Sequence, residues 1–243
     1  MKRLLDFILP PQCASCGTKI SQTPGLCPPC WEKLHFISEP QCVRCGYPFE
    51  IQEAEAHEML CIACAQAFPP YHQLRAVCRY DEASKPLLMR FKHGDATHLA
   101  SLFVQWLAQS GQHLVQESDV LLPVPLHWRR LMKRGYNQAG LLAQGLSRKY
   151  GKTFLPDVLR RKRHTSSQGT KSVAQRAANV SGVFEIPLSK QKLIEGKTIL
   201  LIDDVYASGA TIRECVKVLK HHQAHRVDVL TIARVVRPET LGR

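Results

Sequence analysis

The stretch Leu200-Leu201-Ile202-Asp203-Asp204-Val205-Tyr206-Ala207-Ser208-Gly209-Ala210-Thr211 decides the fold class of this chain. It continues an apolar run that starts at Thr198, and a helix is predicted after it over Ile212 to His221. A continuous apolar run of this length is typical of a strand buried on both faces of a parallel sheet. We therefore expect Asp203 and Asp204 at the carboxyl edge of that sheet, where open α/β sheets bind ligands.

The loop after the two acids suits a phosphorylated sugar. Its residues have little side-chain bulk, so their N–H groups can turn inward around a phosphate, helped by the N-terminus of the next helix. The carboxylates can accept hydrogen bonds from vicinal ribose hydroxyls. The segment lacks the lysine of a P-loop and the glycine pattern of dinucleotide-binding folds. The predicted phosphate-binding residues are Ala207, Ser208, Gly209, Ala210 and Thr211.

This segment resembles the phosphoribosyl pyrophosphate signature of type I phosphoribosyltransferases. The resemblance implies that Asp203 and Asp204 are the catalytic acids that bind the ribose hydroxyls, and that the loop cradles the 5′-phosphate. It also implies Mg²⁺ as a cofactor when phosphoribosyl pyrophosphate binds. Tyr206 and Ala207 depart from the signature, in which an aliphatic residue and a threonine are usual at these places.

The cysteines are concentrated near the N-terminus. Eight of the ten lie in residues 13–64, as four C-x-x-C pairs. A thiolate pair at this spacing can place both sulfurs on one tetrahedral ion about 2.3 Å away, so two pairs complete a structural zinc site. Disulfides are the competing interpretation, but a cytoplasmic chain argues against them. We expect two zinc ions, with sequential pairing preferred and interleaved pairing left open; the ligands are Cys13, Cys16, Cys27, Cys30, Cys42, Cys45, Cys61 and Cys64.

The remainder of the chain alternates strand-like and helix-like segments. Helices are predicted over 84–93, 97–110 and 136–150, and strands over 120–124 and 227–233, whereas residues 160–171 are predicted to form a mobile loop. Such alternation indicates an α/β fold with a parallel sheet. Phe68-Pro69-Pro70-Tyr71 follows the last cysteine pair and suggests a domain boundary. We expect a small N-terminal zinc-ribbon domain over residues 1–68 and a phosphoribosyltransferase-like domain over 69–243.

Nearly all of the excess positive charge lies in one segment. The chain has 33 basic and 20 acidic residues, and residues 127–176 hold 13 of the basic residues with Asp157 as their single acid. Most of these basic residues are arginine, which suits bidentate phosphate contacts. This basic segment favours polyanions such as nucleic acid or pyrophosphate. Its expected anion-binding residues are Arg129, Arg130, Arg134, Arg161 and Arg176, and Trp128 is a candidate for base stacking.

Further blocks of sequence resemble the ComF family of bacteria, which includes the GntX-type proteins. Val124-Pro125-Leu126-His127 and Arg134-Gly135-Tyr136-Asn137-Gln138-Ala139 look like its central block. A second block contains Arg161, Thr165, Gln168, Arg176 and Asn179, and the paired cysteines match the family's double zinc ribbon. The resemblance covers nearly the whole chain. It implies a role in natural transformation, with single-stranded DNA and competence or recombination proteins as partners.

Three functions follow from these patterns. The first is an accessory protein of DNA uptake that binds single-stranded DNA or a phosphorylated ribose. The second is an active phosphoribosyltransferase, in which residues 123–135 and 160–171 bind pyrophosphate and close the site. The third is a scaffold with a vestigial site, which the intact acid pair disfavours. No apolar run approaches the roughly 18 to 20 residues that span a bilayer, and we expect a cytoplasmic protein.

Overall fold

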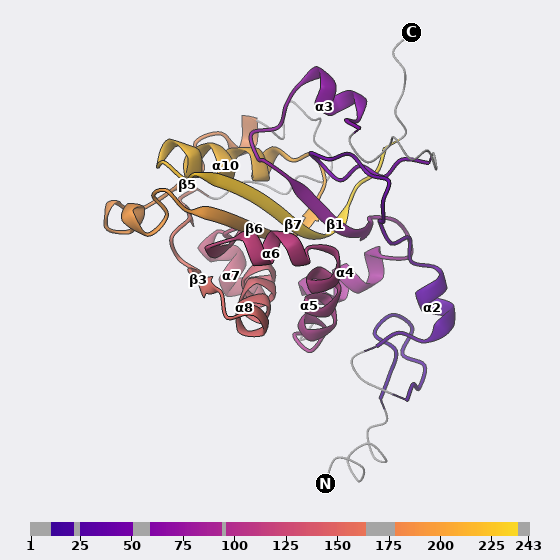
Figure 1. The fold of residues 1–243 in the computed structure, drawn as a ribbon. Coiled ribbons are helices and arrows are strands. Elements are labelled where there is room, and N and C mark those ends of the chain that lie inside the picture. Colours follow the sequence, from indigo (N-terminus) through magenta and orange to yellow (C-terminus); the bar gives the residue numbers. More distant parts are fainter. Residues whose placement is uncertain (1–10, 22–24, 51–58, 94–95, 164–177, 238–243) are drawn as a thin grey trace.

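A five-stranded parallel sheet forms the centre of the molecule (Figure 1). The computed structural model describes residues 11–21, 25–50, 59–93, 96–163 and 178–237. The strands lie in the order β1-β7-β6-β2-β3, and each neighbouring pair is parallel. Their bounds are β1 Leu74–Arg79, β2 Val120–Pro123, β3 Thr153–Phe154, β6 Thr198–Tyr206 and β7 Arg226–Arg234. The expected parallel sheet is confirmed.

The strand order changes direction between β6 and β2. From β2 the chain continues outward to β3, whereas from β6 it continues the other way to β7. In open parallel sheets such a switch point leaves a crevice at the carboxyl ends of the two strands, and ligands bind there. The apolar run of β6 is fully buried from Ile199 to Ile202, so this strand occupies the middle of the core and delivers its polar end to the crevice.

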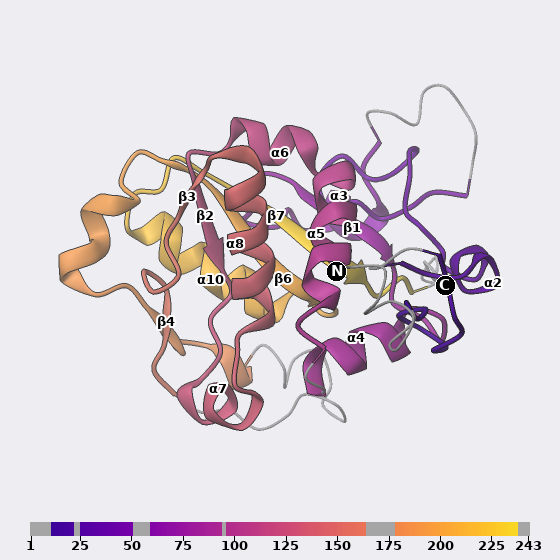
Figure 2. The same ribbon diagram turned by 90° about the horizontal axis from the view of Figure 1, so that it is seen from below.

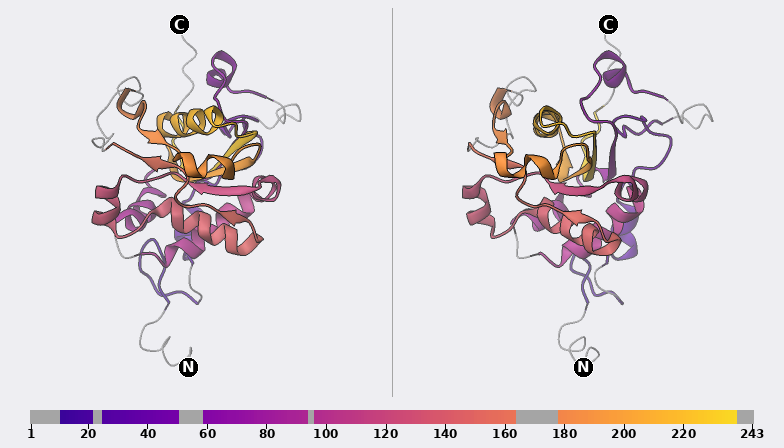
Figure 3. Two further views of the ribbon diagram at one scale, coloured as in Figure 1. Left: turned by 90° about the vertical axis from the view of Figure 1, so that its left-hand side faces the viewer. Right: turned by 60° about the vertical axis from the view of Figure 1, so that its left-hand side comes forward.

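Helices cover both faces of the sheet. On one face lie α4 (Lys85–His93), α5 (Leu99–Ser110), α6 (Gln112–Glu117) and α8 (Gln138–Tyr150), as Figure 2 shows. On the other face lies α10 (Ala210–His221), and in Figure 3 the sheet separates this golden helix from the magenta helices. The predicted helices are confirmed to within two residues. The longest described helix, α8, has 13 residues, and none that the structure describes could cross a membrane.

Several elements differ from the sequence-based expectation. The edge strand β1 and the short helix α7 (Trp128–Arg134) were not predicted. Residues 160–161, expected in a mobile loop, form strand β4, which pairs antiparallel with β5 (Phe184–Glu185). The loop prediction is therefore wrong for these two residues, because a partner strand more than twenty positions later satisfies their backbone. Residues 164–171 of that predicted loop lie outside the described residues, and a 3-10 helix, η2, follows β5 over Leu188–Leu193.

The N-terminal part forms two similar ribbons that lie against opposite faces of the sheet. The first ribbon contains α2 (Pro28–Glu32) and packs beside α4 and α5, whereas the second contains α3 (Ile62–Gln66) and shares a core with α10 (Figure 1). In each ribbon a glycine with positive φ follows the second cysteine of a pair, Gly17 at +78° and Gly46 at +63°. Positive φ is easy for glycine, which therefore suits the turn after each of these cysteine pairs.

The segment between the two ribbons forms backbone hydrogen bonds with the edge strand β1. Phe36 pairs antiparallel with Cys78 of β1, and Ile37 N donates to Val77 O at 2.9 Å. Trp106 of α5 is buried against the rings of Trp31 and Phe36, with centroids 6.0 and 5.5 Å away. Hydrogen bonds and aromatic packing therefore join residues on both sides of the domain boundary predicted at residue 68.

Candidate functional site

The two adjacent acids lie where β6 extends beyond its neighbour β2. The last paired residue of β2 is Pro123, opposite Ile202, and Val124 N then donates to Ile202 O at 2.8 Å. On its other side β6 stays paired with β7, Asp203 opposite Thr231. Beyond Ile202, β6 is therefore still paired with β7 on one side but no longer with β2 on the other, which leaves an opening on the β2 side. Asp203 and Asp204 lie at this opening, on the crevice of the switch point.

The two carboxylates differ in their surroundings. Asp204 Oδ2 lies 3.2 Å from Lys92 Nζ, a residue near the end of α4, and Asp204 N donates to Asp203 Oδ1 at 2.9 Å. Burial, and then the charge of Asp204, raise the pKa of Asp203 to about 8, against opposing effects of Lys92 and Arg161. The two adjacent acids are therefore unlike: Asp204 is paired with Lys92, whereas Asp203 has a raised pKa that favours its neutral form.

The loop after β6 forms a small hollow. Residues 207–209 connect β6 to α10, and the hollow of about 50 Å³ is lined by Asp203, Val205 and residues 206–212. Helix α10 begins at Ala210, two residues before the predicted start, and its N-cap Gly209 provides no side-chain cap. The first-turn N–H groups at residues 210–212 therefore face the hollow's wall without a capping side chain, and the helix dipole adds positive potential there. An anion fits this end of the helix.

Gly209 is required by its conformation and by its neighbour. Its φ is +73°, and a Cβ at this position would lie 2.5 Å from Tyr206 Oη and 2.8 Å from Tyr206 Cζ. The ring of Tyr206 is buried, and its hydroxyl lies 3.1 Å from the hydroxyl of Tyr71. Tyr206, the departure from the phosphoribosyltransferase signature, therefore packs against Gly209 and supports the loop in which a 5′-phosphate is predicted to bind, which we call the phosphate loop.

The first part of the basic segment follows β2 at the same edge of the sheet. His127 is buried and caps α7, since its Nδ1 accepts a hydrogen bond from Arg129 N at 3.3 Å. Asn137 Nδ2 donates to Val124 O at 3.1 Å and ties the end of this segment back to the strand. Helix α7 is therefore held close to the crevice, and it presents four basic residues, Arg129, Arg130, Lys133 and Arg134.

The five predicted anion-binding arginines do not form a single cluster. Burial and the charge of Arg130 lower the pKa of Arg161, whereas Asp203 acts in the opposite direction, so these three side chains share one electrostatic environment. By contrast, Arg129 lies over the exposed ring of Trp128 at 5.3 Å, and Arg134 Nη1 donates to Gln138 Oε1 at 3.2 Å. Arg176 lies outside the described residues. The structure thus brings Arg130 and Arg161 toward the acids.

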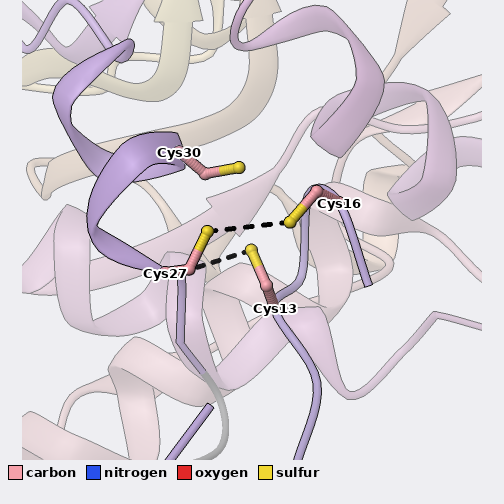
Figure 4. A group of neighbouring side chains, drawn as sticks. All are labelled: Cys13, Cys16, Cys27 and Cys30. Atoms are coloured by element: carbon pink, nitrogen blue, oxygen red, sulfur yellow. Dashed lines mark hydrogen bonds between the residues drawn. The ribbon is translucent and has the colours of Figure 1, made fainter. Parts of the chain in front are cut away.

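The eight paired cysteines form two compact clusters in sequential order. Cluster I contains Cys13, Cys16, Cys27 and Cys30, whose sulfurs point toward one another in Figure 4, and cluster II contains Cys42, Cys45, Cys61 and Cys64. Within each cluster all four sulfurs lie within 4.8 Å of one another. The sulfur–sulfur separations Cys16–Cys27 and Cys45–Cys61 are 3.6 and 3.5 Å.

These dimensions fit zinc. Four thiolates about 2.3 Å from a tetrahedral ion are about 3.8 Å from one another. All ten cysteines, each in a described range, are free of disulfides. The chain therefore has two zinc-binding sites of four cysteines each, with sequential pairing. They differ in exposure, because all four cysteines of cluster II are buried, whereas Cys16 of cluster I is exposed.

Three side chains around the site were not predicted from sequence. Lys92 pairs with Asp204, Tyr71 contacts Tyr206, and Arg234 at the end of β7 lies between the ring of Tyr206 and cluster II. Each of them contacts a residue that is distant in the sequence. A lysine at a helix end or a tyrosine after two prolines carries no local pattern that identifies such a role.

Two protein families match the chain. Residues 4–65 match the double zinc ribbon domain, and residues 113–240 match the phosphoribosyl transferase domain. The second match covers the crevice, the acids and the loop. Both families predicted from the cysteine pairs and the acid signature are therefore confirmed, and with them the fold class of a phosphoribosyltransferase-like sheet carrying an N-terminal zinc ribbon.

Several curated relatives share most of the chain. Competence protein F of Haemophilus influenzae is 29% identical over 75% of this chain and 81% of its own length. DNA utilization protein YhgH of Escherichia coli (strain K12) is 29% identical over 72% of this chain and 78% of its own. Competence protein ComFC of Bacillus subtilis (strain 168) is 28% identical over 94% and 87%. The resemblance to competence proteins that the sequence motifs indicated is confirmed.

Proposed function

The chain belongs to the phosphoribosyl transferase domain family, and on this premise we propose that it is an accessory protein of DNA uptake in natural transformation. In this proposal it acts in the cytoplasm, where it binds a phosphoribosyl ligand at the end of β6 and incoming single-stranded DNA through the basic segment. One observation carries the proposal: the acid pair, the small-residue loop and basic helix α7 meet at one crevice, in a chain whose relatives are named competence proteins.

The crevice supports a ligand with a ribose and a 5′-phosphate. The ribose hydroxyls would donate to Asp203 and Asp204, and the phosphate would accept hydrogen bonds from the loop over residues 207–211. Lys92 and Arg161 would lie near the pyrophosphate of phosphoribosyl pyrophosphate, because both interact electrostatically with Asp203. Two carboxylates are oxygen ligands of the kind that Mg²⁺ prefers. When bound with the pyrophosphate, Mg²⁺ would neutralise part of its charge.

The basic segment supports single-stranded DNA as the second ligand. Trp128 is 57% exposed, with the Arg129 guanidinium over its ring, so a base can stack on the indole while arginine contacts the backbone. Contacts of this kind tolerate any sequence, since every base has a flat face and every nucleotide a phosphate. Competence or recombination proteins are the partners expected to deliver or receive the strand.

Two titrations of the zinc-loaded full chain test the proposal. Calorimetry with phosphoribosyl pyrophosphate and Mg²⁺ should give saturable binding that Asp204→Ala weakens. Fluorescence anisotropy with a labelled single strand should give binding that the same substitution leaves unchanged. Native protein that binds neither ligand would refute the proposal. A pyrophosphate-release assay with a panel of bases then separates the accessory role, with no release, from an active phosphoribosyltransferase.

A further inference from the structure

The second zinc ribbon contacts the phosphate loop through a buried arginine. Arg234 is only 6% exposed, and its Nη1 donates a hydrogen bond to the carbonyl oxygen of Cys45 and lies 3.4 Å from Cys45 Sγ. Four thiolates on one Zn²⁺ carry a net charge of about −2. A guanidinium buried against such a cluster is therefore electrostatically compensated, as a buried charge must be.

The same guanidinium lies between two tyrosine rings. Its Cζ is 5.3 Å from the ring centroid of Tyr47, in the second ribbon, and 5.6 Å from that of Tyr206, in the phosphate-loop segment. Both distances are within the range of cation–π attraction, which strengthens when the cation is desolvated. Arg234 thus joins a ribbon residue to a residue of the candidate site.

Tyr206 in turn contacts the phosphate loop. Its ring lies directly beneath Gly209, where an added Cβ would be 2.5 Å from the tyrosine hydroxyl. The loop cannot move toward the sheet without displacing this ring, and the ring is held by Arg234 and by the hydroxyl of Tyr71. Around these contacts, Ala207 and Ser208 share the lining of a hollow of about 360 Å³ with Cys61 and Cys64 of the ribbon.

We infer that Arg234 and Tyr206 are positioning residues that couple zinc cluster II to the phosphate loop, so that the 5′-phosphate site is formed only when cluster II holds its metal. This inference rests on the proposed function. Cluster I is not part of the coupling, because its ribbon packs beside α4 and α5 on the opposite face of the sheet. The two zinc ions therefore differ in role, and cluster II determines whether the ligand binds.

The inference is tested by comparing affinities for phosphoribosyl pyrophosphate and for the two parts of this ligand, ribose 5-phosphate and inorganic pyrophosphate. In Arg234→Leu, affinity for ribose 5-phosphate and for phosphoribosyl pyrophosphate should fall roughly tenfold or more, the usual effect of losing one interaction with a charged group. Affinity for inorganic pyrophosphate with Mg²⁺ should stay unchanged, since that part of the site does not depend on Tyr206. Equal losses for all three ligands would mean general destabilisation and would overturn the coupling.

Arg75 of β1, which contacts the same ribbon, is a matched control. Arg75 is also buried, and its Nη1 donates to Val43 O at 3.2 Å, so it attaches the second ribbon to β1 without contacting Tyr206. Arg75→Leu should leave ribose 5-phosphate binding within about twofold of the native value. In a Tyr206→Leu background, Arg234→Leu should have little further effect, because their shared contact is already gone. Independent, additive losses would contradict the inference.

A zinc titration tests the coupling without any substitution. Coupling between two binding sites is reciprocal, so phosphoribosyl pyrophosphate should raise the zinc affinity of cluster II by the factor by which zinc raises ligand affinity. When a chelator competes for zinc, the ligand should slow or prevent removal of the ion from cluster II but not of the ion from cluster I. Protection of neither ion, or of both equally, overturns the coupling. Native protein that binds no phosphoribosyl ligand refutes that part of the proposed function, and the coupling with it.

Discussion

Lys92 Nζ lies 3.2 Å from Asp204 Oδ2, although the two residues come from distant parts of the sequence. Lys92 is near the end of α4, and Asp204 follows the buried run of β6. Asp204 is therefore paired with a lysine, whereas burial and the neighbouring charge raise the pKa of Asp203. The acid pair is thus asymmetric, since only Asp204 has a lysine within ion-pair distance in the described part of the chain.

The raised pKa of Asp203 predicts how stability depends on pH. In the unfolded chain this carboxyl loses its proton near pH 4, but in the folded protein only near pH 8. Between these values the unfolded state binds fewer protons, so this group lowers the free energy of unfolding as pH rises, and the loss is complete above about pH 8.

Asp203→Asn removes that dependence. We expect the variant to gain stability over the native protein progressively from about pH 4 to pH 8 in urea unfolding, with little difference below that range, where the native carboxyl is protonated in both the folded and the unfolded state. The carboxylates whose pKa values are lowered, such as Asp81 and Glu117, affect both proteins alike and mainly below pH 5. Parallel stability curves for variant and native protein would show that Asp203 is ionised throughout.

Metal analysis should find two zinc ions per chain. Cys13→Ser and Cys61→Ser should each lose about one ion, because each removes a ligand from a different closed cluster of four cysteines. The two variants should differ in stability: loss from the buried cluster II should lower the unfolding temperature more than loss from the partly exposed cluster I. Freshly purified, reduced protein with one zinc or none contradicts the two-site assignment.

Phosphoribosyl pyrophosphate should bind through the acids and the loop. Asp203→Ala, Asp204→Ala and Gly209→Val should each reduce its affinity roughly tenfold to a hundredfold in calorimetry, as expected for lost hydrogen bonds to a charged group. For Gly209→Val the cause is steric, since φ is +73° and the new side chain meets Tyr206.

Gly151→Val is the matched control for the loop substitution. Gly151 has a φ of +64°, with no atom within 4 Å of an added Cβ, so it imposes similar backbone strain far from the crevice. This variant should lose stability but bind the ligand like the native protein. Undiminished binding in all three site variants would place the ligand elsewhere on the molecule.

Single-stranded DNA should bind with a steep dependence on salt. For single strands, log K falls with log salt by about 0.7 for each phosphate contact. Replacing Arg129, Arg130, Arg134 and Arg161 with alanine should flatten the slope measured by anisotropy between about 50 and 200 mM salt. Asp203→Ala should leave the slope unchanged, because its carboxyl reads sugar hydroxyls. Native protein without single-strand binding at the lowest salt would assign the arginines to pyrophosphate alone.

Local patterns were sufficient for the parts of this protein whose chemistry lies within a few consecutive residues. The run from Thr198 to Thr211 predicted β6, the acids and the loop before α10, because burial on both sheet faces requires an unbroken apolar sequence. The four C-x-x-C pairs predicted both zinc sites, since a thiolate pair at this spacing can place both sulfurs on one ion and two consecutive pairs complete a tetrahedral site. Helices with clear apolar periodicity were predicted equally well.

Only the tertiary structure decided the contacts between distant segments. Strand β1 carries two arginines and looks unlike a core strand, yet Arg75 is buried, and its Nη1 donates a hydrogen bond to the carbonyl of Val43 in the second ribbon. Arg161 forms a strand because Phe184 lies opposite it. Lys92 contacts Asp204, and Arg234 contacts Cys45, because the fold brings these distant segments together. These contacts form because whole helices and strands pack together. Residues that are distant in sequence then become neighbours, so no local sequence pattern predicts them.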